Sequence, residues 1–228
     1  MSRKSPSAQT DATAHHHGDD TTRAPSSGKT DHALLVWETE LECQGNDILA
    51  DLALFERLAS VGDVVNIGSW AAGLMALPDI DIGVLCAELD PDRIMDTLQP
   101  LFHHPRIKRM NFIDERGPLQ SMSGPENEGI YCGLRYLLGL DGEGAEETTW
   151  RLDIWFFPAA APRPEITMRD RLLLAPNHER LAVLRIKDGL IRRGVYGRQL
   201  HCHGVDVYRA VLDRGARSVT DFDRLTAP

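Results

Sequence analysis

The sequence predicts an α+β fold in which a mixed β-sheet is flanked by helices and the C-terminal portion is helical. Two sets of residues indicate the sheet. Residues 64–67 are apolar and β-branched, and residues 80–85 alternate before they become apolar, as strands do. Residues 130–140 and 148–157 are longer strand patterns joined by a turn-prone Asp-Gly-Glu-Gly segment, which predicts a β-hairpin. With 228 residues and 42% hydrophobic composition, the chain can bury a substantial core.

Composition divides the chain into three parts. Residues 1–32 are rich in Ser, Thr, Ala, Asp and Lys and almost lack large apolar side chains, so we expect a disordered leader. Residues 33–160 contain the predicted sheet, and residues 161–228 form a helical C-terminal region. The folded part is expected to open with residues 34–37 and to continue in a helix over about 46–60, for which Asn46 is the candidate N-cap.

The elements between the first two strands and the hairpin follow from local signals. A short helix is expected over about 71–75. Asp90 and Pro91 predict the start of another helix, because Asp caps helices and Pro fits the first helical position, and Pro105 ends it. Residues 107–113 predict a strand, and the Gly- and Pro-rich residues 117–129 predict a loop.

Two helices are expected after the hairpin. The first runs from about Asn177, its candidate cap, to Arg193 and ends at Gly194. The second runs over about 205–214 and ends at Gly215.

The net charge, the hydropathy and the cysteine content limit which classes of protein the chain can belong to. A formal net charge of −9 argues against broad nucleic-acid binding, whereas a cluster of basic residues in the C-terminal third suits one anionic small ligand. No apolar run is long enough to span a membrane, and the N-terminus lacks the apolar segment of a signal peptide. Four widely spaced cysteines predict free thiols in a reducing cytoplasm. The basic cluster comprises Arg185, Lys187, Arg192, Arg193 and Arg198.

One motif contains candidate metal-binding residues. Gly68 and Ser69 are followed by nine residues and then by Asp79-Ile80-Asp81. In a strand, residues two apart project to the same face about 6.5–7 Å apart, so both carboxylates point one way and suit a pair of hard cations. Asp153 is a lone acid in the second hairpin strand, for which a salt bridge to Arg151 or Arg135 is the alternative explanation.

Together these residues resemble the DNA polymerase β-like nucleotidyltransferase superfamily, in particular its small, antibiotic-modifying members. The resemblance is close over residues 64–85 and weak over residues 151–157, and it makes residues 33–160 the nucleotidyltransferase domain. It implies an NTP such as ATP held over two Mg²⁺ ions. Gly68 and Ser69 would hold the triphosphate. Asp79 and Asp81 would ligate the metals, and Asp153 would be a third ligand, a general base, or both.

Other residues leave alternatives open. Lys187 would reach a phosphate if the resemblance holds, or it belongs to a solvated basic helix face. Tyr196 could stack on a ring of the base or of the acceptor, but we favour a packing role for it. His201 and His203 flank a cysteine but lack partners at zinc spacing, so we reject a zinc site there.

The resemblance implies transfer of a nucleoside monophosphate from an NTP to a hydroxyl of a small acceptor, with release of pyrophosphate. A cationic antibiotic would suit an acidic protein, and the C-terminal helices offer a face for a homodimer. One alternative is a nucleotidyltransferase of a toxin–antitoxin pair that acts on a protein or an RNA. Another is a non-catalytic nucleotide-binding regulatory module, against which three converging carboxylates argue because their mutual repulsion costs stability.

Overall fold

The core of the protein is a five-stranded mixed sheet. The computed structural model describes residues 28–117, 128–139, 147–160, 162–197 and 202–227. The strand order is β1-β2-β5-β4-β3, where β2 and β5 are parallel and every other neighbouring pair is antiparallel. The expected mixed sheet is therefore confirmed. The strands are β1 (Asp63–Ile67), β2 (Asp79–Cys86), β3 (Ile107–Asp114), β4 (Ile130–Leu138) and β5 (Thr148–Pro158).

One face of this sheet is covered by helices from the first half of the chain. These are α1 (Asp31–Asp51), α2 (Leu54–Ala59) and α4 (Pro91–Leu98), the last of which continues into a 3₁₀ turn, η1 (Gln99–His103). Their apolar side chains pack on alternate residues of the strands, such as Ile82 and Ile154, which are fully buried. The other residues of the same strands, including the acids of the motif, therefore project from the opposite face.

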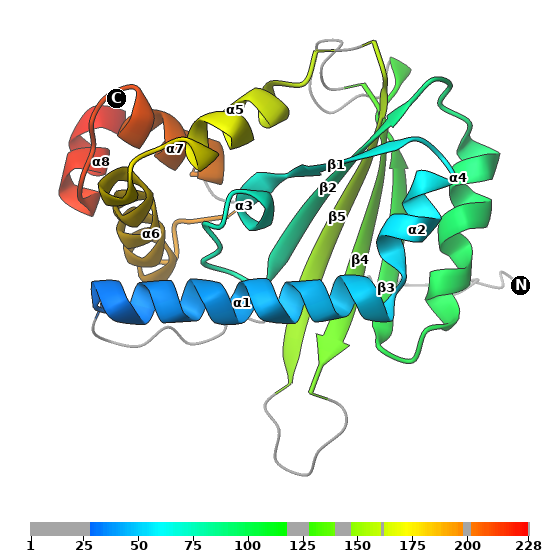
Figure 1. The fold of residues 1–228 in the computed structure, drawn as a ribbon, viewed down its shortest axis with the longest axis horizontal. Coiled ribbons are helices and arrows are strands. Elements are labelled where there is room, and N and C mark those ends of the chain that lie inside the picture. Colours follow the sequence, from blue (N-terminus) through cyan, green and yellow to red (C-terminus); the bar gives the residue numbers. More distant parts are fainter. Residues whose placement is uncertain (1–27, 118–127, 140–146, 161, 198–201, 228) are drawn as a thin grey trace, which may run out of the picture.

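A second core lies beside the sheet, where the C-terminal helices α7 (Gly204–Leu212) and α8 (Val219–Thr226) pack on α6 (Asn177–Arg192), and α6 contacts α1 (Figure 1). Leu34 of α1 packs there with residues such as Ile186 and Val207. The short α3 (Gly68–Ala71) lies between the sheet and this helical group (Figure 1). The C-terminal helices are α5 (Pro164–Leu173), α6 (Asn177–Arg192), α7 (Gly204–Leu212) and α8 (Val219–Thr226).

Several expected boundaries are wrong. The first helix begins at Asp31 rather than near Asn46, and its cap is Thr30, whose hydroxyl accepts a hydrogen bond from the Ala33 amide. The predicted boundary between residues 32 and 33 therefore falls inside this helix. The left-handed conformation of Ala53, with φ 44°, separates α1 from α2 within the single helix that the sequence predicted.

Other local expectations are confirmed in part. Asp90 caps α4 as expected, since its carboxylate accepts hydrogen bonds from two backbone amides. Asn177 begins α6 but does not cap it, and α3 begins at Gly68, three residues earlier than expected. The helices α5 and α8 were not predicted individually. Residues 1–27, most of the loop at 117–129 and the hairpin turn at 141–144 lie outside the described residues.

Candidate active site

Strand pairing brings the three acids of the motif together. Asp79 and Asp81 lie on β2, and the parallel register with β5 places Asp153 directly beside Asp81. Each carboxylate offers one oxygen that lies within 4.8 Å of the others. Between the two acids of β2, Ile80 points into the core and is fully buried. Hard oxygen donors at this separation are the chemistry that Mg²⁺ prefers.

Gly68 has a steric reason to be glycine. Its φ is +72°, in the left-handed region, and a Cβ at this position would lie 2.2 Å from Oδ2 of Asp81. Any side chain would therefore displace that carboxylate. The next residue, Ser69, is half-buried in the same turn, and its carbonyl accepts a hydrogen bond of 2.9 Å from the Leu74 amide. The Gly-Ser pair therefore lies against the acids, as the spacing of the motif predicted.

Asp153 is held from the neighbouring strand. Its side chain is almost fully buried, and the hydroxyl of Tyr131 on β4 donates a hydrogen bond of 2.6 Å to Oδ1. The guanidinium of Arg135 lies 3.9 Å from the same oxygen. The sequence offered a salt bridge to Arg135 or Arg151 for Asp153; the structure shows the one to Arg135, and Arg151 forms an ion pair with Asp79.

Lys187 on α6 is buried, so the alternative of a solvated basic face is wrong for this residue. Its side chain is 1% exposed, and Nζ donates hydrogen bonds to the Leu74 carbonyl at 2.9 Å and to the Tyr208 hydroxyl at 2.8 Å. Burial lowers the pKa of Lys187 to about 7, although the negative charges of Asp81 and Asp79 oppose that shift. The ammonium therefore lies close enough to the acids to respond to charge in the site.

Tyr196, the other residue singled out in this region, packs near the same amine. Its ring lies 6.0 Å from Nζ of Lys187. Burial raises the pKa of the Tyr196 hydroxyl well above its ordinary value. These contacts agree with the packing role that the sequence left open.

A row of arginines begins at the acids and crosses the sheet. Arg151 on β5 pairs in register with Asp79 on one side and with Arg135 on the other, and Arg135 pairs with Arg109 on β3. Directly opposed residues have Cβ atoms about 4.5–5.5 Å apart, so the three side chains form one stripe. Arg109 is exposed at the far end, and no carboxylate of the described residues pairs with it. The sequence does not predict this stripe, because it depends on the order in which the strands pair.

Among the described residues, the acidic triad is a group of side chains with metal-binding geometry. His203 caps α7 in a reciprocal arrangement with Asp206. His201 lies outside the described residues. All four cysteines are free, as expected.

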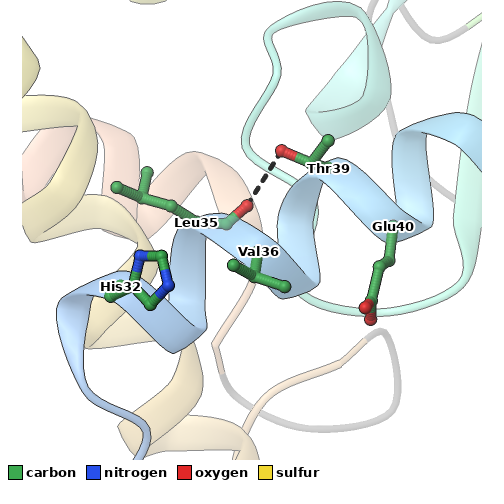
Figure 2. Close-up of a pocket in the computed structure, with 5 residues that line it drawn as sticks. All are labelled: His32, Leu35, Val36, Thr39 and Glu40. Carbon is green, nitrogen blue, oxygen red and sulfur yellow. Dashed lines mark hydrogen bonds between the residues drawn. The ribbon is translucent and has the colours of Figure 1, made fainter.

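A surface hollow of about 290 Å³ lies on the outer side of α1 and is unrelated to the acids (Figure 2). The polar contact drawn there, from the Thr39 hydroxyl to the Leu35 carbonyl, is internal to the helix. The hollow brings no group of carboxylates together, so we assign the site by the geometry of the triad. Its lining residues are His32, Leu35, Val36, Thr39 and Glu40.

Comparisons with known proteins address the fold. No protein-family model and no curated protein matches the sequence. Among solved structures, a mutant of the Cid1 poly(U) polymerase bound to MgATP superposes with a TM-score of 0.54 at 16% identity, covering 80% of this chain and 54% of that one. The chain therefore shares the fold of this polymerase. This agrees with the resemblance predicted from the motif, although nothing in the comparison supports the antibiotic-modifying subtype.

Two further structures are more distant. A cytoplasmic RNA terminal U-transferase gives a TM-score of 0.49 at 15% identity, covering 81% of this chain and 49% of that one. A CdnC:HORMA-deltaN complex from E. coli MS115-1 gives 0.36 at 15% identity, covering 85% and 61%. The chain thus spans about half the length of the first two structures. None of the helices in the described residues combines the length and apolar character needed to cross a membrane.

Proposed function

We propose that this protein transfers a nucleoside monophosphate from an NTP to a hydroxyl group and releases pyrophosphate. The observation that carries the proposal is the convergence of Asp79, Asp81 and Asp153 beside a Gly-Ser turn that has room for no side chain at Gly68. The nucleotidyltransferase fold supports it. A binding module would gain nothing from three acids whose mutual repulsion costs stability.

The donor set fits Mg²⁺. It consists of carboxylate oxygens within 4.8 Å of one another, and Gly68 leaves the Asp81 carboxylate the space that it occupies. Asp79, Asp81 and Asp153 would hold two ions. When bound, such ions neutralise phosphate charge and polarise the reacting phosphoryl group.

The remaining roles fall to residues around the triad. The Gly68–Ser69 turn holds the triphosphate through its backbone amides and the Ser69 hydroxyl. Lys187 supports this segment through its bond to the Leu74 carbonyl. Because the pKa of Lys187 is lowered to about 7 by burial, an arriving triphosphate favours the protonated amine and gains a positive charge in the site. Asp153 accepts the proton of the attacking hydroxyl.

The arginine stripe favours an acceptor that carries negative charge. Arg135 and Arg109 continue from the acids toward the sheet edge, and Arg109 meets no carboxylate within the described part of the chain. A phosphate-bearing small molecule such as a nucleotide therefore suits the site better than the cationic antibiotic expected from the net charge. The proposed acceptor remains a small hydroxylated molecule, and we place the reaction in the cytoplasm, where free thiols persist.

A second candidate is transfer to the end of an RNA. The same stripe supports it, because guanidinium groups bind phosphates of a polymer as readily as those of a nucleotide. The net charge of −9 favours the smaller acceptor.

The test is label transfer from each α-labelled NTP with Mg²⁺, using nucleotides, short RNAs and hydroxylated antibiotics as separate acceptors. We expect label on a nucleotide, with none in the Asp79→Ala variant. Label on RNA would select the second candidate. Label on an uncharged or cationic acceptor alone would contradict the role of the stripe, and Mg²⁺-dependent NTP binding without turnover would favour the regulatory module.

A further inference from the structure

Tyr131 donates a hydrogen bond to Asp153 of the triad, and the sequence motif gave this tyrosine no role. It lies on β4, two residues before Gly133, so both face the side of the sheet that carries the acids. Gly133 pairs in register with Asp153. The tyrosine ring therefore runs along its own strand, over Gly133, and places its hydroxyl on the carboxylate of the next strand at 2.6 Å.

Gly133 makes this path possible. A Cβ on Gly133 would lie 2.4 Å from the Tyr131 hydroxyl oxygen and 2.8 Å from Oδ1 of Asn111. Both distances are too short for real contacts, so even alanine would push the hydroxyl off Asp153. Glycine inside a strand weakens it, and close approach by another group is a common reason for its presence. Here that group is Tyr131.

An aromatic row holds the ring from the other side. The ring of Tyr131 lies 4.9 Å from that of Trp155, its register partner on β5, and Trp155 stacks on Phe157 at 5.7 Å with an interplanar angle of 3°. The guanidinium of Arg163 lies 3.9 Å above Phe157. Tyr131 is 5% exposed, so its ring has little freedom to leave this position.

We propose that Tyr131 is a positioning residue that fixes the Asp153 carboxylate for the reaction, and that Gly133 is glycine in order to admit it. This inference rests on the proposed function. The two oxygens of a carboxylate move together, so holding Oδ1 with Tyr131, with Arg135 at 3.9 Å, sets the direction of the other oxygen. Groups that bind metals or accept protons work only within about 0.5 Å of the productive geometry.

Two substitutions remove the contact by different routes. Tyr131→Phe deletes the hydroxyl and keeps the ring stack, whereas Gly133→Ala keeps the hydroxyl and displaces it. Tyr136→Phe is the matched control, because Tyr136 lies on the same strand, faces the opposite side and donates to Asp51 at 2.7 Å. Asp79→Ala serves as the reference for loss of the triad.

The measurements are the Mn²⁺ dissociation constant of the protein alone by electron paramagnetic resonance, the kcat and KM for the NTP, and the thermal midpoint. We expect Tyr131→Phe and Gly133→Ala each to weaken Mn²⁺ binding and to lower kcat about 10–100-fold, as removal of a ligand's supporting partner does. The KM for the NTP should change little, because in the proposed reaction Asp153 acts on the attacking hydroxyl. Tyr136→Phe should match the wild type in Mn²⁺ affinity and kcat.

The double variant isolates the mechanism. If Gly133→Ala acts by displacing the Tyr131 hydroxyl, then adding it to Tyr131→Phe should cost less than 3-fold in kcat beyond the single Tyr131→Phe change. If the loss of kcat in the double variant equals the product of the losses in the two single variants, the link between the two residues is overturned. Should Gly133→Ala fail to fold, Tyr131→Phe alone decides the role of the hydroxyl.

The outcomes separate this inference from the proposed function. Normal Mn²⁺ affinity and kcat in Tyr131→Phe, with both lost in Asp79→Ala, would overturn the positioning role and leave the proposed function standing. A lowered thermal midpoint with normal Mn²⁺ affinity and kcat would make the contact merely structural and also overturn it. If Asp79→Ala itself binds Mn²⁺ like the wild type, the triad is not a metal site and both fail.

Discussion

Gly68→Ala tests whether the Gly-Ser turn shapes the site or merely connects two elements. The substitution adds one methyl group, and that group has nowhere to go. In the present backbone it would lie 2.2 Å from Oδ2 and 2.8 Å from Cβ of Asp81. Either the carboxylate moves or the turn does, and in both cases the turn and the acids lose their relative placement.

The magnitude has two parts. Alanine at a φ of +72° costs about 1–2 kcal/mol of stability, because the left-handed region is unfavourable for any residue with a Cβ. Relief of the contact requires a shift of about 1 Å, and misplacement by 1 Å at a reacting centre costs about 100-fold in rate. We therefore expect kcat to fall about 100-fold, equivalent to about 3 kcal/mol in the barrier.

Gly215→Ala is the matched control. Gly215 has a φ of +71°, and a Cβ there would meet nothing within 4 Å. It should lose the same 1–2 kcal/mol, which lowers the thermal midpoint by roughly 3–6 °C for a chain of this size. Its nucleotide transfer should stay within about 2-fold of the wild type, because it introduces strain without displacing a carboxylate.

The assay is label transfer under saturating NTP, with thermal denaturation of each variant measured in parallel. Two results would refute the reasoning. One is full activity in Gly68→Ala, which would mean that the Asp81 carboxylate need not stay where it is. The other is equal loss of activity in Gly215→Ala, which would trace the effect to general instability.

Three further perturbations have definite expected outcomes. The pKa of Lys187, lowered by burial to about 7, means that the unfolded chain binds more protons than the folded one above that pH. As the pH rises from 7 to 8.5, the free energy of unfolding of the wild type should therefore increase by roughly 1–2 kcal/mol relative to that of Lys187→Met, as measured by urea denaturation. The same pH dependence in both proteins would contradict a lowered pKa of Lys187. Asp79→Asn, or removal of Mg²⁺ with EDTA, should reduce nucleotide transfer at least about 1,000-fold, while the circular dichroism spectrum shows that the protein remains folded. Retained transfer would rule out metal dependence. Arg109→Glu should raise the KM for a phosphate-bearing acceptor about 10-fold without altering that for the NTP, whereas Arg224→Glu, the same charge change at an exposed position on α8, should alter neither.

The motif itself was predictable from sequence because its signals are local. The alternation around Asp79 and Asp81 fixes which side chains share a face, and the run before Gly68 ends where the strand does. Asp153 was visible as a single acid among apolar and aromatic residues. These patterns depend on periodicity within one element, which the sequence carries directly.

What could not be predicted depends on pairing between elements. The parallel register of β2 and β5 places Asp153 beside Asp81, and the antiparallel register of β4 places Gly133 and Tyr131 over it. A shift of one residue would turn every one of these side chains to the other face. Arg109 was missed for the same reason.

The helices show two other kinds of limit. In α1 the buried Leu34, Leu41 and Ile48 are spaced by whole pairs of turns, but charged residues between them concealed the stripe. Lys187 looked like part of a basic surface because its burial comes from partners distant in sequence, Leu74 and Tyr208. Helix propensity alone indicates neither the buried stripe of α1 nor the burial of Lys187.

In the proposed reaction, the α-phosphate of an NTP moves to an acceptor hydroxyl and the outer two phosphates leave together as pyrophosphate. The most direct measurement compares α-labelled and γ-labelled NTP with Mg²⁺ and the acceptor found in the panel. We expect α-label on the acceptor, γ-label in pyrophosphate, and neither product with Asp79→Ala. Transfer of γ-label to the acceptor, or its release as inorganic phosphate, would show phosphoryl transfer or hydrolysis and contradict the proposed nucleotidyl transfer.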